Sequence, residues 1–340
     1  MLERMVKTMK KSNKITAILV LCILFSIFAN PAFGLESRVF FVNNESDLIQ
    51  LAADCTLDTY SQGLTVILTR DIQISDESFH GIPTFGGTFN GNNHIISNLS
   101  MTHEGSTYGL FRYIQTNGVV QNLKIEVDLQ LTGTENRIGG IAGENRGIIE
   151  NCEVSGSLIG KSHIGGIVAK NEATGQIIDC HFEGTVTGEN FSGGISGENY
   201  GLIKNCTNTG SINTTVAPST LHIEDISLQK INDTENIIAS TNSGGIAGFN
   251  RGIIEACLNE GIVGYHHVGY NIGGIAGRQD GYISNSINKA PVLGRKDVGG
   301  IVGQMEPYQV IKSDEDFFRE LEEELDKLQT SIDAAYDQID

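Results

Sequence analysis

Short apolar blocks separated by glycine and polar residues recur along most of the chain. A typical block is Ile148-Ile149-Glu150, which follows Gly147 and precedes Asn151-Cys152. Blocks this short and rich in Ile and Val are typical of strands, and each of the many glycines would cost about 1 kcal/mol inside a helix. The pattern therefore predicts an all-β protein built from many short strands.

The blocks belong to a repeat that opens with two glycines and an isoleucine. Its copies begin 26, 28, 51, 29 and 26 residues apart, at Gly139, Gly165, Gly193, Gly244, Gly273 and Gly299. A period in this range is typical of a solenoid, whose coils bury their apolar side chains only by stacking. We expect a right-handed parallel β-helix with three strands and three turns in each coil. Six full coils are expected, beginning near Gly109, Gly139, Gly165, Gly193, Gly244 and Gly273.

A second set of glycines precedes the strand blocks. Its members are Gly147, Gly175, Gly201, Gly252 and Gly281. Glycine adopts positive φ without steric cost, and tight corners need that conformation. We therefore expect these glycines, Gly201 among them, to form the corners of the coils at positive φ.

The N-terminal part of the chain departs from the repeat. Residues 1–34 combine a lysine-rich start, the apolar stretch 15–28 and a small-residue site at 32–34, which is typical of a secretory signal peptide. Residues 35–84 predict an N-terminal cap made of a helix over 45–59 plus strands. A cap is expected because an uncovered first coil would expose an apolar end and an open sheet edge.

The solenoid itself is expected over residues 85–310, and two segments differ from it. The interval 214–242 is a polar insertion, predicted to protrude as a loop. Such insertions often lie on the binding face, although a loop without function is the alternative. Residues 311–340 carry apolar residues at alternating spacings of four and three, which predicts an acidic coiled-coil helix. This helix is expected either to pair with another chain or to continue in a longer natural protein.

Charge narrows the range of partners. The chain carries a net charge of −18, and removal of five basic residues and one acid with the signal peptide leaves −22. A polyanion of this size is repelled by nucleic acid and by anionic membranes. We therefore expect no nucleic-acid partner and no membrane insertion after signal removal.

Four cysteines recur at one position of successive coils, namely Cys152, Cys180, Cys206 and Cys257. Leu99 and Leu123 fill that position in the first coils, which favours a buried column of reduced thiols. Stacked side chains lie too far apart for ideal disulfides, so disulfides and a metal site are the weaker alternatives. Cys55 has no partner in this column.

Two further columns are expected to point outward, and neither gathers the carboxylates that glycan cleavage needs. The first contains Glu144, Lys170, Glu198, Phe249, Arg278 and Gln304, and the second contains Glu150, Ile178, Lys204, Glu255 and Ser284. Their charges alternate, which is typical of a surface ladder. The aromatic residues Tyr200, Phe249, Tyr265 and Tyr270 are interpreted as dispersed, and tryptophan is absent.

Two other polar patterns are interpreted as structural. An asparagine column comprises Asn98, Asn122, Asn151, Asn205 and Asn285, with Asp179 as a near match. Stacked amides can satisfy backbone groups at a coil bend. The adjacent His266 and His267 lack an evident third ligand, so a solvated loop is favoured over a metal site.

The Gly-Gly-Ile-x-Gly repeats with Ile-x-Asn-Cys strands resemble the GLUG-motif repeats of bacterial exported proteins. The resemblance covers about residues 40–308 and extends to the N-terminal part of some immunoglobulin A peptidases. It implies a β-solenoid used as a stalk or binding surface. The His-Glu-x-x-His helix of zinc peptidases is absent, because His103-Glu104 is followed by Gly105-Ser106-Thr107.

These observations predict a non-catalytic exported module for surface display or adhesion, secreted or associated with the bacterial cell surface. The alternative is the non-catalytic arm of a larger exported enzyme. No residue is assigned to catalysis, to a cofactor or to a metal. The expected partner is an unknown extracellular protein or glycan, and oligomerisation is expected through the C-terminal helix.

Overall fold

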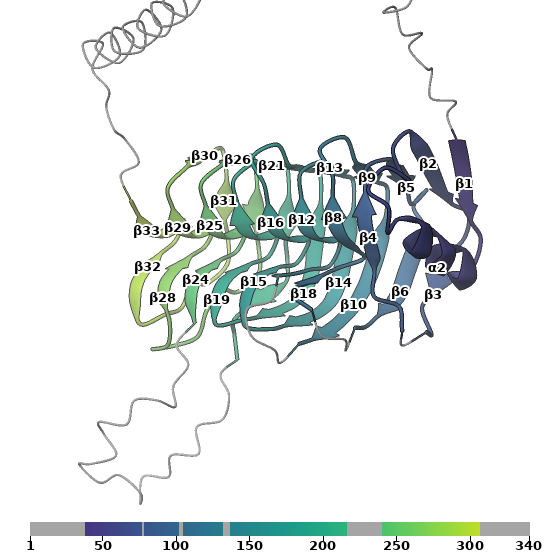
Figure 1. Ribbon diagram of the computed structural model, residues 1–340. Helices are drawn as coiled ribbons and strands as arrows, with labels where there is room; N and C mark the ends of the chain where they lie inside the picture. Colours follow the sequence, from purple (N-terminus) through teal and green to yellow (C-terminus); the bar gives the residue numbers. More distant parts are fainter. Residues whose placement is uncertain (1–37, 77, 102–104, 132–136, 216–239, 307–340) are drawn as a thin grey trace, which may run out of the picture. The chain divides into compact units, whose positions relative to one another are not determined.

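The computed structural model describes residues 38–306 except 77, 102–104, 132–136 and 216–239. The signal peptide predicted at 1–34 and the coiled coil predicted at 311–340 therefore lie outside the described residues, as does most of the predicted insertion. The described chain forms a parallel β-solenoid whose coils follow one another in chain order (Figure 1). The right-handed sense of the coil stays a prediction.

Four sheets make up the solenoid, and neighbouring strands within each run parallel. Sheet A contains β1 (Arg38–Val42), β2 (Leu64–Leu68), β5 (Thr88–Asn90), β9 (Val119–Gln121), β13 (Ile148–Glu150), β17 (Gln176–Ile178), β21 (Leu202–Lys204), β26 (Ile253–Glu255) and β30 (Tyr282–Ser284). Sheet B contains β3 (Ile72–Gln73), β6 (Ile95–Leu99), β10 (Lys124–Gln130), β14 (Glu153–Ile159), β18 (His181–Thr187), β22 (Thr207–Asn208), β23 (Ser211–Ile212), β27 (Leu258–Asn259) and β31 (Ile287–Asn288).

Sheets C and D carry the strands on either side of the Gly-Gly-Ile segments. Sheet C contains β4 (Ile82–Phe85), β8 (Phe111–Ile114), β12 (Ala142–Asn145), β16 (Val168–Asn171), β20 (Ser196–Asn199), β25 (Ala247–Asn250), β29 (Ala276–Gln279) and β33 (Val302–Met305). Sheet D contains β7 (Thr107–Tyr108), β11 (Arg137–Gly139), β15 (Ser162–Gly165), β19 (Asn190–Gly193), β24 (Thr241–Gly244), β28 (Tyr270–Gly273) and β32 (Lys296–Gly299).

The expectation of three strands in each coil is wrong, because the Gly-Gly-Ile segment is a bend and not the start of a strand. In one coil, β11 ends at Gly139 and β12 begins at Ala142. A Cβ on Gly139 would overlap the carbonyl oxygen of Ala142, and one on Gly140 would lie 2.6 Å from the Gly166 oxygen of the next coil. The two consecutive glycines avoid these overlaps at the bend that separates sheet D from sheet C.

The predicted positive φ at Gly201 is also wrong. The residues that adopt this conformation at the adjoining corner are those of the asparagine column, such as Asn151 at +51° and Asn205 at +54°. Asparagine tolerates the left-handed region better than most residues with a side chain. Gly201 is required for a different reason, since a Cβ there would overlap the Gly175 carbonyl oxygen of the preceding coil.

The core lies between the sheets and is built of one-residue columns. The isoleucine of the bend is fully buried in five successive coils, from Ile141 to Ile275, and the cysteine column is also buried. Ile301 of the last bend is exposed. Phe85, Phe89 and Phe111 fill the N-terminal part, with ring centroids 5.2 to 6.1 Å apart. Burial of such columns is the main stabilising term of a stacked repeat.

One α-helix, α2 (Glu45–Asp54), lies near the N-terminal end of the described chain and is shorter than the predicted 45–59. Asn44 is its N-cap, because its side chain accepts a hydrogen bond from the Asp47 amide at 3.1 Å. Leu48 and Leu51 are buried, and the helix contacts β1 and β4. Strands β1 to β4 join sheets A, B and C directly. The capping role of the helix stays a prediction.

The described C-terminal edge of the predicted insertion belongs to the repeat. Thr241 and Asn242 form the start of β24, which pairs in register with β19 of the preceding coil. The C-terminal boundary at 242 is therefore wrong, because hydrogen bonding to the coil before it orders these polar residues as a strand.

Candidate functional site

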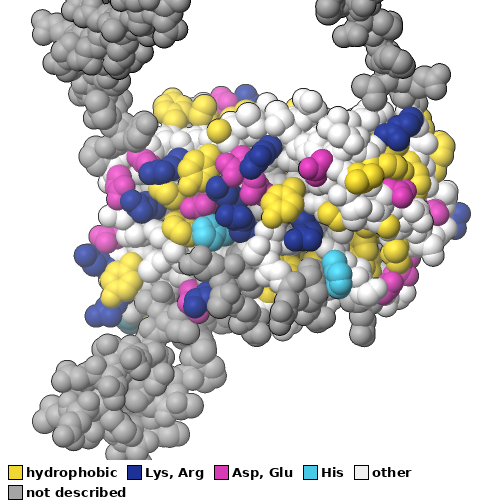
Figure 2. All heavy atoms as spheres, viewed as in Figure 1, with side chains coloured by type: hydrophobic (Ala, Val, Ile, Leu, Met, Phe, Trp, Pro, Cys, Tyr) yellow, Lys and Arg dark blue, Asp and Glu magenta, His cyan; other side chains and the backbone are white. Residues whose placement is uncertain are grey.

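The outward residues of sheet C and the neighbouring residues of sheet D form one surface along the solenoid, which we call the C–D face. Strand register places Tyr113, Glu144, Lys170, Glu198, Phe249 and Arg278 in one column of sheet C. Gln304 lies in β33, the last strand of the same sheet. The column predicted from the sequence is thus confirmed as far as Arg278. Figure 2 shows charged and hydrophobic side chains gathered on the visible face of the molecule.

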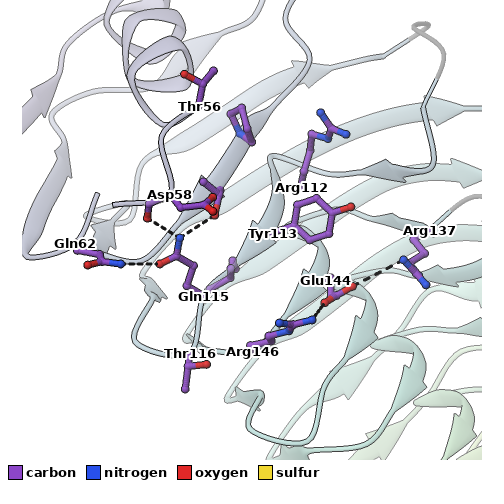
Figure 3. Close-up of a pocket in the computed structure, with 13 residues that line it drawn as sticks. Thr56, Asp58, Gln62, Arg112, Tyr113, Gln115, Thr116, Arg137, Glu144 and Arg146 are labelled. Atoms are coloured by element: carbon purple, nitrogen blue, oxygen red, sulfur yellow. Dashed lines mark hydrogen bonds and ion pairs between the residues drawn. The ribbon is translucent and has the colours of Figure 1, made fainter. Parts of the chain in front are cut away.

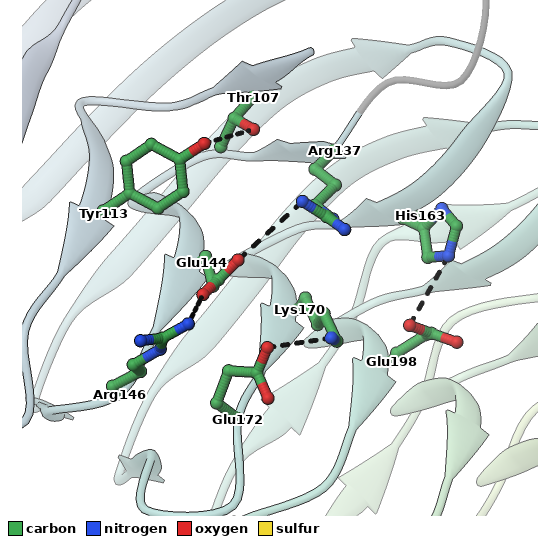
Figure 4. A network of polar contacts seen from close by, with 9 residues as sticks. All are labelled: Thr107, Tyr113, Arg137, Glu144, Arg146, His163, Lys170, Glu172 and Glu198. Atoms are coloured by element: carbon green, nitrogen blue, oxygen red, sulfur yellow. Dashed lines mark hydrogen bonds and ion pairs between the residues drawn. The ribbon is translucent and has the colours of Figure 1, made fainter.

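The two carboxylates of this column are buried, not freely exposed as a surface ladder would be. Glu144 and Glu198 are each only 7% exposed. Arg137 of sheet D approaches Glu144 at 3.8 Å, and Arg146 donates to it at 2.7 Å. His163 of sheet D lies 3.4 Å from Glu198 (Figure 4). The adjoining sheet buries these side chains, because the bend brings the two columns together.

The surroundings of the column shift the pKa of two of its residues, Glu198 and Lys170. Desolvation raises the pKa of Glu198 above its ordinary value, although the positive charges of Lys170 and Arg137 oppose this shift. Burial alone would lower the pKa of Lys170, but its hydrogen bond to Glu172, at 2.8 Å, and the charge of that residue raise it. Glu144 and Glu198 are separated by Lys170, so the two carboxylates do not converge on one point.

Aromatic side chains that are distant in sequence meet on the C–D face. Phe191 of sheet D lies between His163 and Phe249, with ring centroids 4.9 and 6.0 Å away. The Arg251 guanidinium lies 5.2 Å from the Phe249 ring and 6.0 Å from the Tyr200 ring. The interpretation of Tyr200 and Phe249 as dispersed is therefore wrong. Stacking of coils brings together residues whose separation in the sequence is one whole repeat.

Sequence reasoning missed the contribution of sheet D to this face. His163 and Phe191 both have positive φ, at +54° and +52°. Asn242, Asn271 and Asp297, which occupy the same strand position in later coils, share this conformation. The sequence feature that could have revealed these residues is their constant position, two residues before each Gly-Gly pair. Their side chains differ in chemistry, so no motif was apparent.

A ladder of buried amide side chains runs along sheet C beneath the C–D face. The sequence analysis did not predict it. Each amide nitrogen donates to the amide oxygen of the next coil at 2.7 to 2.9 Å, along Asn145, Asn171, Asn199, Asn250 and Gln279. These side chains are at most 4% exposed. The signal was an amide six residues after the first glycine of each repeat. The ladder satisfies buried polar groups and is structural.

The predicted asparagine column lies at the surface. Asn151 is exposed and donates to the Asn122 side chain at 2.6 Å. Its neighbours in the second outward column, from Glu150 through Ile178, Lys204 and Glu255 to Ser284, are in register as predicted. Lys204 and Glu255 form an ion pair at 2.9 Å.

The cysteines of the described chain are all free and buried: Cys55, Cys152, Cys180, Cys206 and Cys257. Each thiol of the column approaches backbone carbonyls, as Cys180 does at 3.2 Å to Ile178. Burial raises the pKa of Cys152 and Cys206, which disfavours the thiolate. His266 and His267 are exposed, with ring centroids 6.1 Å apart. Among the described residues no cluster of three or more His, Cys, Asp or Glu could hold a metal ion.

A cleft of about 740 Å³ opens at the N-terminal part of the C–D face. Its walls are the loop after α2, strands β4 and β8, and the Arg137 to Arg146 part of the next coil (Figure 3). Gln115 holds the loop against the sheet, because its amide donates to the Asp58 carbonyl at 2.7 Å and to Thr84 Oγ1 at 2.9 Å. In the described part of the chain no helix is long and apolar enough to cross a membrane.

Comparison with known proteins agrees with a repeat protein that folds as a β-solenoid. Residues 160–187, which span one coil from before β15 to the end of β18, match the model of the GLUG motif. Halomucin of Haloquadratum walsbyi is 33% identical over 155 residues, which cover 42% of this chain and 2% of that protein. The chain therefore corresponds to a small part of this relative.

Two solved structures share the fold. A crystal structure of a "putative immunoglobulin A1 protease" from Bacteroides ovatus aligns with a TM-score of 0.57 and 16% identity, over 80% of this chain and 85% of that chain. An IgA1 protease aligns with a TM-score of 0.55 and 17% identity, over 82% of this chain and 21% of that one. The chain is therefore a β-solenoid that contains a match to the GLUG motif over residues 160–187, and its fold is that of the matched parts of these two structures.

Proposed function

We propose that this chain is a non-catalytic module of a surface or secreted protein and that the C–D face is its binding surface. The observation that carries the proposal is the continuity of this face. Five consecutive coils contribute charged or aromatic side chains to one column, from Glu144 to Arg278. A rigid scaffold with a long decorated face is typical of solenoid recognition.

The arrangement of charges favours binding over catalysis. Glycan cleavage needs two carboxyl groups that converge on one bond. Glu144 and Glu198 lie on either side of Lys170, and each has its own partner, Arg146 for the first and His163 for the second. Glu198 thereby links sheet C to sheet D. Glu144 binds both Arg137 of sheet D and Arg146 in the turn after β12.

The relatives support a location outside the cell. Halomucin and the two proteins described as immunoglobulin A1 proteases are the matches from which a surface or secreted location is inferred. This chain corresponds to only 21% of the IgA1 protease chain. That partial coverage favours a second candidate, a non-catalytic arm of a larger exported enzyme.

A binding assay tests the proposed function. Purified protein is applied to immobilised mucin and to neutral and acidic polysaccharides, and the size of each ligand is followed by chromatography. We expect saturable binding to at least one ligand with no change in its size. Absence of binding to every ligand, or shortening of one, would contradict the proposal.

A matched pair of variants locates the binding surface. Arg251→Gln removes a cation from the C–D face, where Arg251 contacts Phe249 and Tyr200. Lys289→Gln removes a cation that is paired with Glu260 next to sheet B. We expect about fivefold weaker binding from the first, equivalent to about 1 kcal/mol, and no change from the second. Equal effects would place the surface elsewhere.

The two candidates differ in the size of the native protein. The protein is isolated from its source with an antibody, and its mass and peptides are determined by mass spectrometry. Peptides from an attached catalytic domain would establish the enzyme arm. Their absence across a fully covered native chain supports the independent module.

A further inference from the structure

We propose that the cleft bounded by the loop at 56–62 and strands β4, β8 and β12 binds the acidic group of an anionic saccharide. The proposal rests on the proposed function, since it names the ligand class for one part of the same binding surface. The charge, hydrogen-bonding groups and shape of the cleft do not depend on what the rest of the C–D face binds.

The cleft is basic on an acidic protein. The whole chain carries a net charge of −18, yet the cleft is lined by Arg112, Arg137 and Arg146 against Asp58 and Glu144. Glu144 is already shared between Arg146 and Arg137, at 2.7 and 3.8 Å. An acidic ligand would be repelled by most of this protein's surface, so local guanidinium groups are the feature that selects it.

Arg112 is the arginine of the cleft whose charge is available to a ligand. Within the described residues no ion pair includes Arg112, and its Nε is buried without a hydrogen-bond partner. Nε itself is closed to solvent, so a carboxylate or sulfate oxygen in the cleft would bind the terminal nitrogens of this guanidinium. Guanidinium groups bind such anions through paired, charge-assisted hydrogen bonds.

The remaining lining suits a sugar ring. Tyr113 is 36% exposed, and its hydroxyl is held by Thr107 at 3.2 Å, so the orientation of the ring is set before a ligand arrives. The amide of Gln62 and the hydroxyl groups of Thr84 and Thr116 also line the cleft. An aromatic face beside neutral hydrogen-bonding groups matches the apolar face and hydroxyls of a saccharide.

A peptide is a poorer occupant of this cleft. Extended peptides bind by adding to a free strand edge, but β8 and β12 are paired on both edges, and the edge strand β4 contacts α2. Amphipathic helices need an apolar groove, whereas Pro83, Tyr113 and the 1% exposed Ile114 are the main apolar lining residues. The geometry therefore favours a saccharide over an acidic peptide.

Calorimetric titration of the purified protein tests the proposal. The probes are a short oligogalacturonate, sialyllactose and a sulfated disaccharide, each beside its neutral counterpart: the methyl ester, lactose and the unsulfated sugar. We expect at least one acidic probe to bind at one site, its neutral counterpart to bind at least tenfold more weakly, and the affinity to fall as salt is raised.

Variants connect this binding to the cleft. Arg112→Gln should weaken the acidic probe at least tenfold, with a melting temperature near that of the parent protein. Lys204→Gln, which removes an equal charge from sheet A, should leave the affinity unchanged. Should Arg112→Gln fail to fold, Arg112→Lys keeps the charge but loses the planar fork, and a severalfold loss is expected from it.

Several outcomes would overturn the proposal. These are the failure of all acidic probes, equal binding of acidic and neutral sugars, an unaffected Arg112→Gln variant, and a polyglutamate peptide that binds as tightly as the saccharide. Full competition by inorganic sulfate at equal concentration would indicate a site for simple anions. If the parent protein and Arg112→Gln bind immobilised mucin or polysaccharide equally, the cleft is excluded while the proposed function stands.

Discussion

At the scale of single residues, one amino-acid type serves different ends according to its place in the coil. Asn145 is fully buried in the amide ladder, whereas Asn151 is exposed at a corner with φ of +51°. Asn271 adopts positive φ in sheet D and donates to Asn242 at 2.9 Å. All three are polar residues that belong to columns repeated along the stack. Polarity alone therefore could not reveal which of them is buried.

Glu198 provides a prediction of pH dependence. Burial raises its pKa, so the folded state holds the proton more tightly than the unfolded chain. The stability of the parent protein should fall as the pH rises from the ordinary glutamate value of 4.5 through the raised folded pKa. Glu198→Gln lacks this dependence and should gain stability relative to the parent over that window.

Urea unfolding at a series of pH values checks this expectation. Glu183→Gln removes the same charge from an exposed position and corrects for the change in net charge. Parallel stability curves for the parent and Glu198→Gln would show that burial does not control the titration of this carboxyl group.

At the scale of elements, the strands are linked by side-chain columns as well as by backbone hydrogen bonds. Asn199 accepts from Asn171 at 2.8 Å and donates to Asn250 at 2.7 Å, so it connects β16, β20 and β25. It also accepts from the Gly201 amide at 3.2 Å and thereby holds the turn before β21. The ladder therefore couples neighbouring coils at a buried corner.

Removal of Asn199 should be costly. Asn199→Ala leaves the buried amides of Asn171 and Asn250 with lost partners, and we expect a loss of about 2 to 4 kcal/mol in unfolding free energy. Asn151→Ala should cost about 1 kcal/mol or less, because Ala256 already adopts φ of +54° at the equivalent corner. Equal urea midpoints for the two variants would contradict the structural role of the buried ladder.

At the scale of the molecule, each coil provides the surface on which the next one packs. A Cβ on Gly274 would overlap the carbonyl oxygen of Gly300 in the following coil, whereas a Cβ on Gly300 has no atom within 4 Å. The same change is thus expected to have different effects inside and at the end of the described stack.

This difference is directly measurable. Gly274→Ala should lower the free energy of unfolding by about 1 to 3 kcal/mol, because the coils must move apart. Gly300→Ala should change it by about 0.5 kcal/mol or less. Comparable losses from both variants in urea unfolding would show that Gly300 is also covered in solution.

The cysteine column reports on unfolding of the whole stack. Cys152, Cys180, Cys206 and Cys257 are free and buried, so a thiol reagent should not label them in the folded protein. Labelling should follow addition of denaturant, without any reductant, as measured by intact mass. If labelling required a reductant, the column would contain disulfides.

The repeat period, the all-β class and the membership of the outward columns were determined by the sequence itself. Successive coils bury equivalent side chains in equivalent places, so a stacked array imposes its period on the chain, and alignment of repeats then reveals register. Glu144, Lys170 and Glu198 could be placed side by side on this ground alone. The start of the helix at residue 45 was also predicted from the sequence, because capping is a local interaction.

Only the tertiary structure decided how the coil bends and which polar columns it buries. The Gly-Gly pair permits a close fold that separates sheet D from sheet C, and this fold places Arg137 against Glu144 and Phe191 against Phe249. Contacts of this kind depend on the angle between two sheets, which a linear pattern does not encode. The cleft around Arg112 also depends on a tertiary contact, because the Gln115 side chain donates to the Asp58 carbonyl and holds the loop after α2 against sheet C.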